Sequence, residues 1–272
     1  LSASGRTRAQ VNRQRLARTR DLLGALRVTV FAPDDLDLVK GGPASRRRYL
    51  DDLLVAVHPR HDRTRSDVDR ILKQRNALLK QAGGRLDADA TATLDVWDAR
   101  LAVAATALGT ARRELVAHLA PALGAAYDTV AHEAAHVVAT YEPEWLDAGY
   151  GEVLAAGRAA DVRRGVTLVG PHRDDLELAI GAMPARTHAS QGEQRSLAFA
   201  LRIAGHALVT EEIEAPPVLV LDDVFSELDP GRSHALLQAL PPGQTILTTA
   251  GSLPDGVVPE LTLHVAGGRV GS

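Results

Sequence analysis

Two neighbouring acids, Asp222 and Asp223, come directly after four apolar residues, Val218 to Leu221. Four β-forming residues in a row predict a strand buried on both faces, as in the middle of a parallel sheet. Open α/β sheets bind ligands beyond the carboxyl ends of such strands. One carboxylate there can hold Mg²⁺ through its water shell, and the other can deprotonate a water that attacks a phosphoryl group. Because acids also cap helices and fill turns, the pair alone is a weak signal.

A second candidate site lies upstream, in the run Ser190-Gln191-Gly192-Glu193, which leads into a predicted helix over 196–210. A hydroxyl and a glycine-exposed backbone at a helix N-terminus form a ready anion site. The same residues also match a capping box, with Ser190 as the N-cap and Glu193 at the third helical position. An anion site and a capping box are compatible, so the sequence predicts both at this helix N-terminus.

The order of these motifs resembles that of ABC ATPases, in which a signature loop precedes a Walker B strand and a D-loop follows it. Here the D-loop match is Ser226-Glu227-Leu228-Asp229, three residues after Asp223. The resemblance implies that Asp222 is the Mg²⁺-associated acid and that Asp223 stands where many of these enzymes have a catalytic glutamate. It assigns contacts with ATP held by the opposite protomer to Ser190, Gln191, Gly192, Glu193 and Asp229.

Two departures from the ABC pattern predict slow hydrolysis. Glu193 stands where a glutamine is common and adds negative charge near phosphates unless a basic group offsets it. After the predicted strand over 245–249 comes Ala250-Gly251, without the histidine of the switch position.

Several further segments resemble the RecF family, and together they extend from about residue 5 to about residue 250. The most specific is the GPHRDD element within Gly165–Leu176; the others are Phe31–Leu36, Arg46–Asp51 and Gln74–Leu79. RecF proteins are bacterial recombination mediators with an ABC/SMC-like head and an inserted helical lobe.

The family resemblance implies a cytoplasmic, slow ATPase that uses ATP and Mg²⁺ and forms an ATP-dependent homodimer. It implies binding to single-stranded DNA and single-strand/duplex junctions, and cooperation with RecR and RecO to load recombinase during recombinational repair, replication restart and the SOS response. An SMC-like or other ABC head from a different pathway remains an alternative, although the predicted helical arm is far shorter than an SMC coiled coil.

The phosphate cradle of such ATPases is missing from this sequence. A P-loop needs Gly-x-x-x-x-Gly-Lys-Ser/Thr, because backbone amides and one lysine hold the phosphates. None of the lysines Lys40, Lys73 and Lys80 follows a glycine. The chain also begins at Leu1, and Met183 is its only methionine. We therefore expect an N-terminally truncated sequence whose P-loop lies upstream, so that this chain alone is inactive.

The expected fold class is α/β: an ABC-type ATPase head, incomplete because the Walker A region is missing, with an inserted helical lobe. Residues 1–60 are expected to belong to the head and the transition into the arm, 61–150 to the helical lobe, and 151–272 to the rest of the head. Apolar residues at alternating spacings of three and four predict a helix over 94–115. A further helix is predicted between Pro121 and Pro143, and strands are predicted at 166–169 and 176–180.

Composition limits the remaining choices. The absence of cysteine excludes disulfides and thiolate metal sites, and no apolar run approaches the ~20 residues that a membrane span needs. A net charge of −3 argues against a general polycation, but arginines cluster locally. Arg46, Arg47 and Arg48 are the candidate DNA contacts, with the Arg6–Arg20 stretch as a second cluster. A solvated basic face is the alternative, and a non-catalytic remnant that only binds DNA is the matching functional alternative.

One motif points elsewhere. His132-Glu133-Ala134-Ala135-His136 matches the H-E-x-x-H pattern of zinc peptidases, in which two histidines on one helical face bind zinc and the glutamate acts as base. No third histidine ligand follows at the usual spacing, so zinc hydrolysis is kept as the less favoured alternative.

Overall fold

The computed structural model describes residues 9–131, 135–227, 230–253 and 256–271. At its centre is a parallel three-stranded sheet in the order β3-β7-β8. Its strands are Val28–Phe31, Val218–Asp222 and Thr245–Thr248. The predicted central strand is confirmed, with its neighbour at 245–248, but its predicted burial on both faces is wrong. Leu219 and Leu221 are buried, whereas Val218 and Val220 are half-buried. Val30 and Ile246, the partners of Val220 in the neighbouring strands, are exposed, so this face of the sheet is open.

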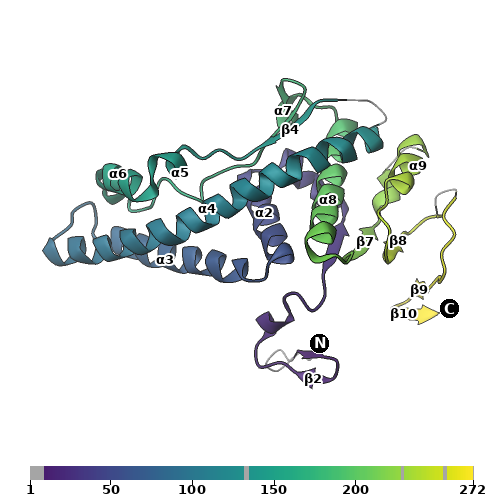
Figure 1. Cartoon of the computed structure of the whole chain (residues 1–272), viewed down its shortest axis with the longest axis horizontal. Helices are drawn as coiled ribbons and strands as arrows, with labels where there is room; N and C mark the ends of the chain where they lie inside the picture. The colour runs from purple at the N-terminus through teal and green to yellow at the C-terminus, as the bar shows by residue number, and fades with distance from the viewer. Residues whose placement is uncertain (1–8, 132–134, 228–229, 254–255, 272) are drawn as a thin grey trace.

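Helices cover this sheet and connect it to an elongated arm (Figure 1). The longest of the covering helices is α8, Gln191–Ile213, whose Phe199 packs edge-on against Phe31 of β3 with ring centroids 4.9 Å apart. Helix α9, Pro230–Gln238, adds the buried Leu236 to the same apolar cluster. The other helical segments of the head are α1 (Asp37–Lys40), α2 (Pro43–Val57), α7 (Ala185–His188) and the 3₁₀ turns Thr19–Leu22, Pro33–Leu36 and Val224–Glu227.

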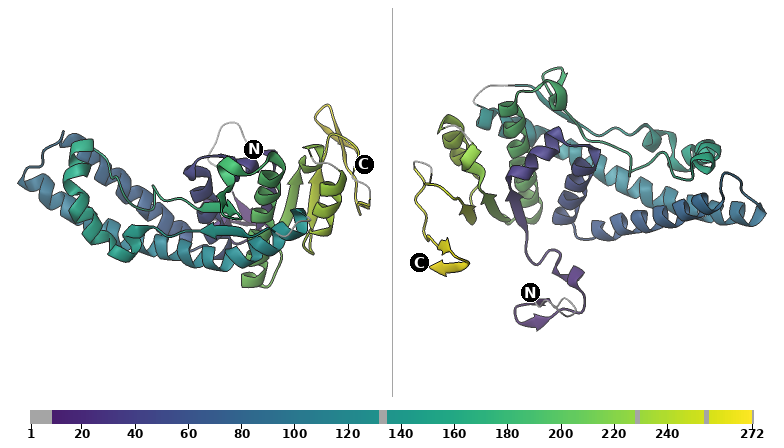
Figure 2. Two further views of the ribbon diagram at one scale, coloured as in Figure 1. Left: turned by 90° about the horizontal axis from the view of Figure 1, so that it is seen from above. Right: turned by 180° about the vertical axis from the view of Figure 1, so that it is seen from behind.

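The arm is a pair of long helices, α3 and α4, that run side by side away from the sheet (Figures 1 and 2). Helix α3 spans His61–Gln81, and α4 spans Ala88–Ala131. The predicted seam of α4 is confirmed, because its leucines are all buried: Leu94, Leu101, Leu108 and Leu115. Helix α6, Tyr150–Arg164, packs against both arm helices, and the short α5, Glu144–Ala148, precedes it.

The prediction of a separate helix between Pro121 and Pro143 is wrong. Helix α4 continues through Pro121 to Ala131. A proline inside a helix removes one backbone hydrogen bond and crowds the preceding turn. Leu119 and Leu123, on either side of the proline, are fully buried, so tertiary packing holds this part of the helix in place.

A second, antiparallel sheet in the order β4-β5-β6 follows the arm. Its strands are Val137–Thr140, Glu177–Ile180 and Met183–Pro184. Strand β5 confirms the strand predicted at 176–180. Two small ribbons complete the chain: β1–β2 (Gln10–Val11 and Gln14–Arg15) and β9–β10 (His264–Ala266 and Arg269–Gly271). Within the described residues no helix combines the length and apolarity that crossing a bilayer requires.

The predicted strand at 166–169 is also wrong, since these residues form no sheet. Their backbone groups bond to side chains instead. Thr167 N–H donates to Asn76 Oδ1 at 2.8 Å, and Leu168 N–H donates to Asp161 Oδ1 at 3.1 Å. Tyr150 donates its hydroxyl proton to Val169 O at 2.7 Å. Satisfied in this way, the backbone needs no neighbouring strand.

Beneath this segment lies Arg75 of α3, which is completely buried. Its Nε donates to Asp98 Oδ1 of α4 at 2.6 Å, and its Nη1 donates to Asp161 Oδ2 of α6 at 2.7 Å. The same Nη1 donates to Thr167 Oγ1 at 2.8 Å. One guanidinium therefore joins both arm helices, α6 and the 166–169 segment.

We expect Arg75→Met to lower the free energy of unfolding by about 3–5 kcal/mol, because it leaves the buried carboxylate of Asp161 without its cation and that of Asp98 with Arg158 alone. Urea denaturation followed by circular dichroism measures the loss. Arg70→Gln is the matched control on the same helix; Arg70 is exposed, and its removal should cost less than about 0.5 kcal/mol. Equal losses at the two positions would contradict the assigned role of Arg75.

Candidate functional site

The two predicted acids lie at the carboxyl end of β7, where Thr248 of β8 contacts both. Thr248 Oγ1 donates to Asp222 Oδ1 at 2.5 Å. Asp223 N–H donates to Thr248 O at 3.1 Å and approaches Thr248 Oγ1 at 3.2 Å. Asp222 is exposed, so its carboxylate is open to solvent or to a ligand. Thr248 is a positioning residue that the sequence reasoning missed, because only the pairing of β7 with β8 brings it there.

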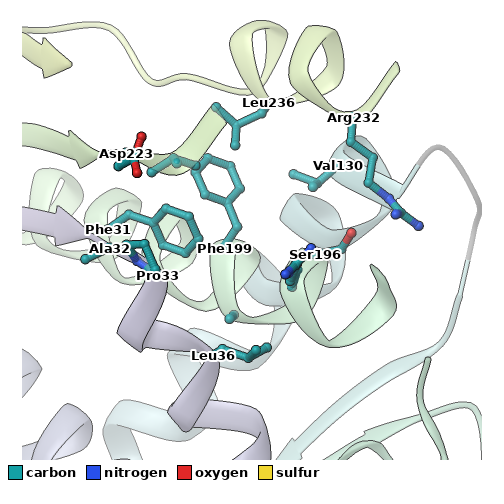
Figure 3. Close-up of a pocket in the computed structure, with 13 residues that line it drawn as sticks. Phe31, Ala32, Pro33, Leu36, Val130, Ser196, Phe199, Asp223, Arg232 and Leu236 are labelled. Atoms are coloured by element: carbon teal, nitrogen blue, oxygen red, sulfur yellow. The ribbon is translucent and has the colours of Figure 1, made fainter. Parts of the chain in front are cut away.

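Asp223 adopts a left-handed backbone conformation, with φ of 50°. Aspartate tolerates the left-handed region better than most residues. A residue in this conformation cannot continue a strand, so β7 ends at Asp222. Asp223 then lines a pocket of about 40 Å³ between β3, α8 and α9. Figure 3 shows Asp223 at one side of this pocket and Arg232 at the other, with the ring of Phe199 between them.

The predicted capping box at the start of α8 is confirmed. Ser190 is the N-cap, and its Oγ accepts a hydrogen bond from Glu193 N–H at 3.3 Å. Ser190 N–H in turn donates to Glu193 Oε2 at 2.7 Å. These bonds to Ser190, with the nearby charge of Arg232, hold the pKa of the Glu193 carboxyl below its usual value. The exposed Ser190 keeps the end of the helix accessible.

The basic group near Glu193 is Arg232 of α9, which the sequence reasoning also missed. A Cβ atom added to Gly192 would come within 2.3 Å of Arg232 Nη2 and 2.6 Å of its Cζ. The guanidinium therefore packs directly on the glycine, where no larger residue fits without displacing it. Arg232 also lines the pocket of Asp223, together with Arg195 of α8. Its only sequence signal was its place three residues after Asp229.

The three adjacent arginines of α2 have different surroundings. Arg46 is buried, and each of its three guanidinium nitrogens donates: Nε and Nη2 to Asp175 at 2.7 Å, and Nη1 to two backbone carbonyls. Arg47 is half-buried and donates to Asp174 O at 2.8 Å. Arg48 is exposed, with no hydrogen bond or ion pair to any residue that the structure describes. Arg46 thus forms a structural ion pair with Asp175, whereas Arg48 is accessible to a ligand.

The GPHRDD element is held in place by hydrogen bonds from other parts of the chain. Asp174 accepts hydrogen bonds from Tyr141 Oη at 2.6 Å and Trp145 Nε1 at 2.8 Å. Burial raises the pKa of the Asp174 carboxyl, and these two bonds oppose the rise. Arg112 of α4 donates to Pro171 O at 2.7 Å. The element is therefore fixed against both the arm and the head.

Some predicted residues lie outside the described part of the chain: the D-loop acid Asp229, and His132 and Glu133 of the zinc-peptidase motif. The described part of helix α4 reaches Ala131, and His136 O accepts a hydrogen bond from Gly181 N–H just before β4. Among the described residues, no group of three or more histidine, aspartate or glutamate side chains gathers as a metal site.

Comparison with known proteins identifies the family. A curated DNA replication and repair protein RecF from Streptomyces avermitilis is 43% identical over 288 residues, which cover 99% of this chain and 76% of that protein. RecF from Arthrobacter sp. strain FB24 is 39% identical over 308 residues, covering 98% of this chain and 77% of the relative. The chain belongs to the RecF family. No protein-family model matches it.

The RecF fold is confirmed by a solved structure of the recombination mediator protein RecF-ATPrS in the RecFOR pathway. It superposes with a TM-score of 0.84 at 25% identity, over 96% of this chain and 71% of that one. A second RecF structure, with ATP, superposes equally well at 24% identity. The predicted fold class, an α/β ABC-type ATPase head with a helical lobe, therefore holds for this RecF chain.

We expect Ser190→Ala to cost about 1 kcal/mol of stability, because the N–H groups at the start of α8 lose their cap. Thermal unfolding measures the change. Ser190→Asn is the control: asparagine caps about as well as serine, so its melting temperature should stay near that of the parent. A cap role is excluded if the asparagine and alanine variants lose the same stability.

Proposed function

We propose that this RecF protein is an ATP-dependent DNA-binding protein of recombinational repair and replication restart. It acts at single-strand/duplex junctions and helps to load recombinase, with RecR and RecO as partner mediators in the cytoplasm. The observation that carries this proposal is that a RecF-family chain holds Asp222 and Asp223 at a strand end and an exposed, capped helix N-terminus at Ser190.

The acids supply the chemistry of the proposed slow ATPase. Asp222 offers an exposed carboxylate oxygen fixed by Thr248, which is the type of ligand that Mg²⁺ prefers. Bound Mg²⁺ would neutralise phosphate charge. Asp223 is the proposed base that orients and deprotonates the attacking water.

The N-terminus of α8 supports the proposed ATP-dependent homodimer. Backbone N–H groups at a helix start attract anions, and Ser190 and Gln191 are exposed there. The side chain of Glu193 is occupied by its bond to Ser190, and Arg232 offsets its charge. This loop can therefore face the γ-phosphate of ATP held by the opposite protomer, with Ser190, Gln191, Gly192, Glu193 and the D-loop Asp229 as its proposed contacts.

For DNA, the accessible cations of α2 are the proposed contacts. Arg48 is exposed, Arg47 is half-buried, and Arg46 is committed to Asp175. Among the described residues of the N-terminal cluster, Arg20 already pairs with Asp62. Arg48 and Arg47 are therefore favoured over Arg46 and Arg20.

In a form of the protein that includes a P-loop segment, Asp223→Asn should lower single-turnover ATP hydrolysis by about 10²–10⁴-fold, the usual contribution of a positioned base. Rapid-quench measurement of radiolabelled phosphate gives the rate. Asp89→Asn, an exposed acid at the start of α4, is the control and should leave the rate unchanged. If Asp223→Asn retains the parental rate, Asp223 is not the base.

The chain of 272 residues should hydrolyse no ATP by itself, because its sequence contains no Gly-x-x-x-x-Gly-Lys-Ser/Thr cradle. Phosphate release from the purified chain, compared with a heat-inactivated sample, tests this. Hydrolysis above the inactivated sample would show that the phosphates are held in another way.

A further inference from the structure

A polar cavity of about 450 Å³ opens where helices α2, α3 and α4 meet the loop at Pro171 and His172. It shares no lining residue with the pocket of Asp223. Its volume falls in the range of small-molecule sites, but polar and charged side chains together outnumber the apolar ones in its lining. What it can bind therefore depends on how those charges balance.

Two of the lining arginines are already neutralised. Arg112 of α4 is buried and forms a two-pronged ion pair with Asp51 of α2, at 2.8 and 2.9 Å. Arg65 of α3 pairs with Asp52 at 2.9 Å and with Asp62 at 3.1 Å. These pairs build the wall of the cavity and leave little net charge for a ligand.

The other two lining arginines form no direct ion pair with a described carboxylate. Arg47 hydrogen-bonds to a backbone carbonyl rather than to a carboxylate, and Arg48 has no bonded partner among the described residues. Burial and the nearby charge of Arg112 lower the pKa of the Arg47 guanidinium, and the carboxylates of Asp175, Asp174 and Asp51 oppose the fall. Against these two cations the lining offers one further carboxylate, the exposed Asp69 of α3. The cavity therefore carries an excess of positive charge.

His172 adds an unused polar group to the same lining. Its Nε2 donates to Thr167 O at 3.0 Å, since a carbonyl can only accept. Its Nδ1 is buried and has no hydrogen-bond partner in the described part of the chain. With the ring proton on Nε2, Nδ1 is an acceptor, so the partner that it lacks is a donor, such as a hydroxyl or amino group of a ligand rather than an ionised phosphate oxygen.

We infer that this cavity is a binding site for a phosphate group, carried by a small nucleotide or by a nucleic acid strand. Guanidinium groups match phosphate oxygens in charge and geometry, and Arg48 is exposed at the site. The inference rests on the proposed DNA-binding function only for the choice of one probe. It is independent of the ATP site, because Asp223 lies in the other pocket.

The test titrates inorganic pyrophosphate into the purified chain by isothermal titration calorimetry. Arg48→Gln should weaken binding about tenfold, as expected for the loss of one charge-assisted hydrogen bond. Asp69→Asn should strengthen binding about fivefold, because a negative charge leaves the lining. Arg163→Gln, an exposed arginine of α6 with the same change of charge, should have no effect. All three positions are exposed, so circular dichroism should show an unchanged fold.

Opposite shifts in the Arg48 and Asp69 variants support the site, since general destabilisation would weaken binding in both. If Arg48→Gln matches Arg163→Gln, or if Asp69→Asn weakens binding, the inference is overturned. Competition identifies the source of the phosphate. Displacement of pyrophosphate by a short oligothymidylate indicates a nucleic acid strand. In that case the slope of the logarithm of the binding constant against the logarithm of the salt concentration should fall by about one in Arg48→Gln. Displacement by adenosine monophosphate alone indicates a small nucleotide.

Discussion

The buried guanidinium of Arg75 is the interaction on which the rest of the arm depends. It lies among two carboxylates and a hydroxyl from α4, α6 and the 166–169 segment, so none of these elements can move alone without exposing an unpaired charge. The segment that it holds leads directly into the GPHRDD element, where Asp175 pairs with Arg46 and Pro171 meets Arg112. A chain of buried polar contacts therefore runs from the middle of the arm to the head, and the apolar seam of α4 is built around it.

Periodicity predicted the parts of the fold in which apolar side chains alone decide the outcome. The leucines of α4 were recognised because burial of one face repeats at the period of a helix, and the Val218–Leu221 run was recognised because four β-forming residues follow one another. Periodicity failed to predict the secondary structure where hydrogen bonds from side chains or tertiary packing determine the backbone conformation. At 166–169, Asn76 and Asp161 satisfy the backbone that a neighbouring strand would otherwise pair with. At Pro121, burial of the flanking leucines outweighs the local preference of proline to interrupt a helix.

The candidate site shows the same division. The positions of Asp222, Asp223 and the Ser190–Glu193 cap were predictable because each belongs to a continuous motif next to a regular element. Thr248 and Arg232 were not, because they come from β8 and α9 and reach the site only through tertiary packing. The three arginines of α2 demonstrate the limit most clearly. Adjacent in sequence and identical in type, they differ in burial because a helix turns by about 100° per residue.

Because Arg232 packs on Gly192, a substitution at one of these two positions changes which residues fit at the other. While the guanidinium occupies that space, residue 192 can accept a side chain only if the arginine side chain shifts. Replacement of Arg232 by a short residue would release position 192 and at the same time leave Glu193 without its nearby cation. Across RecF sequences, the identities of residues 192, 193 and 232 should therefore vary together, as a single unit of charge and shape shared by two helices.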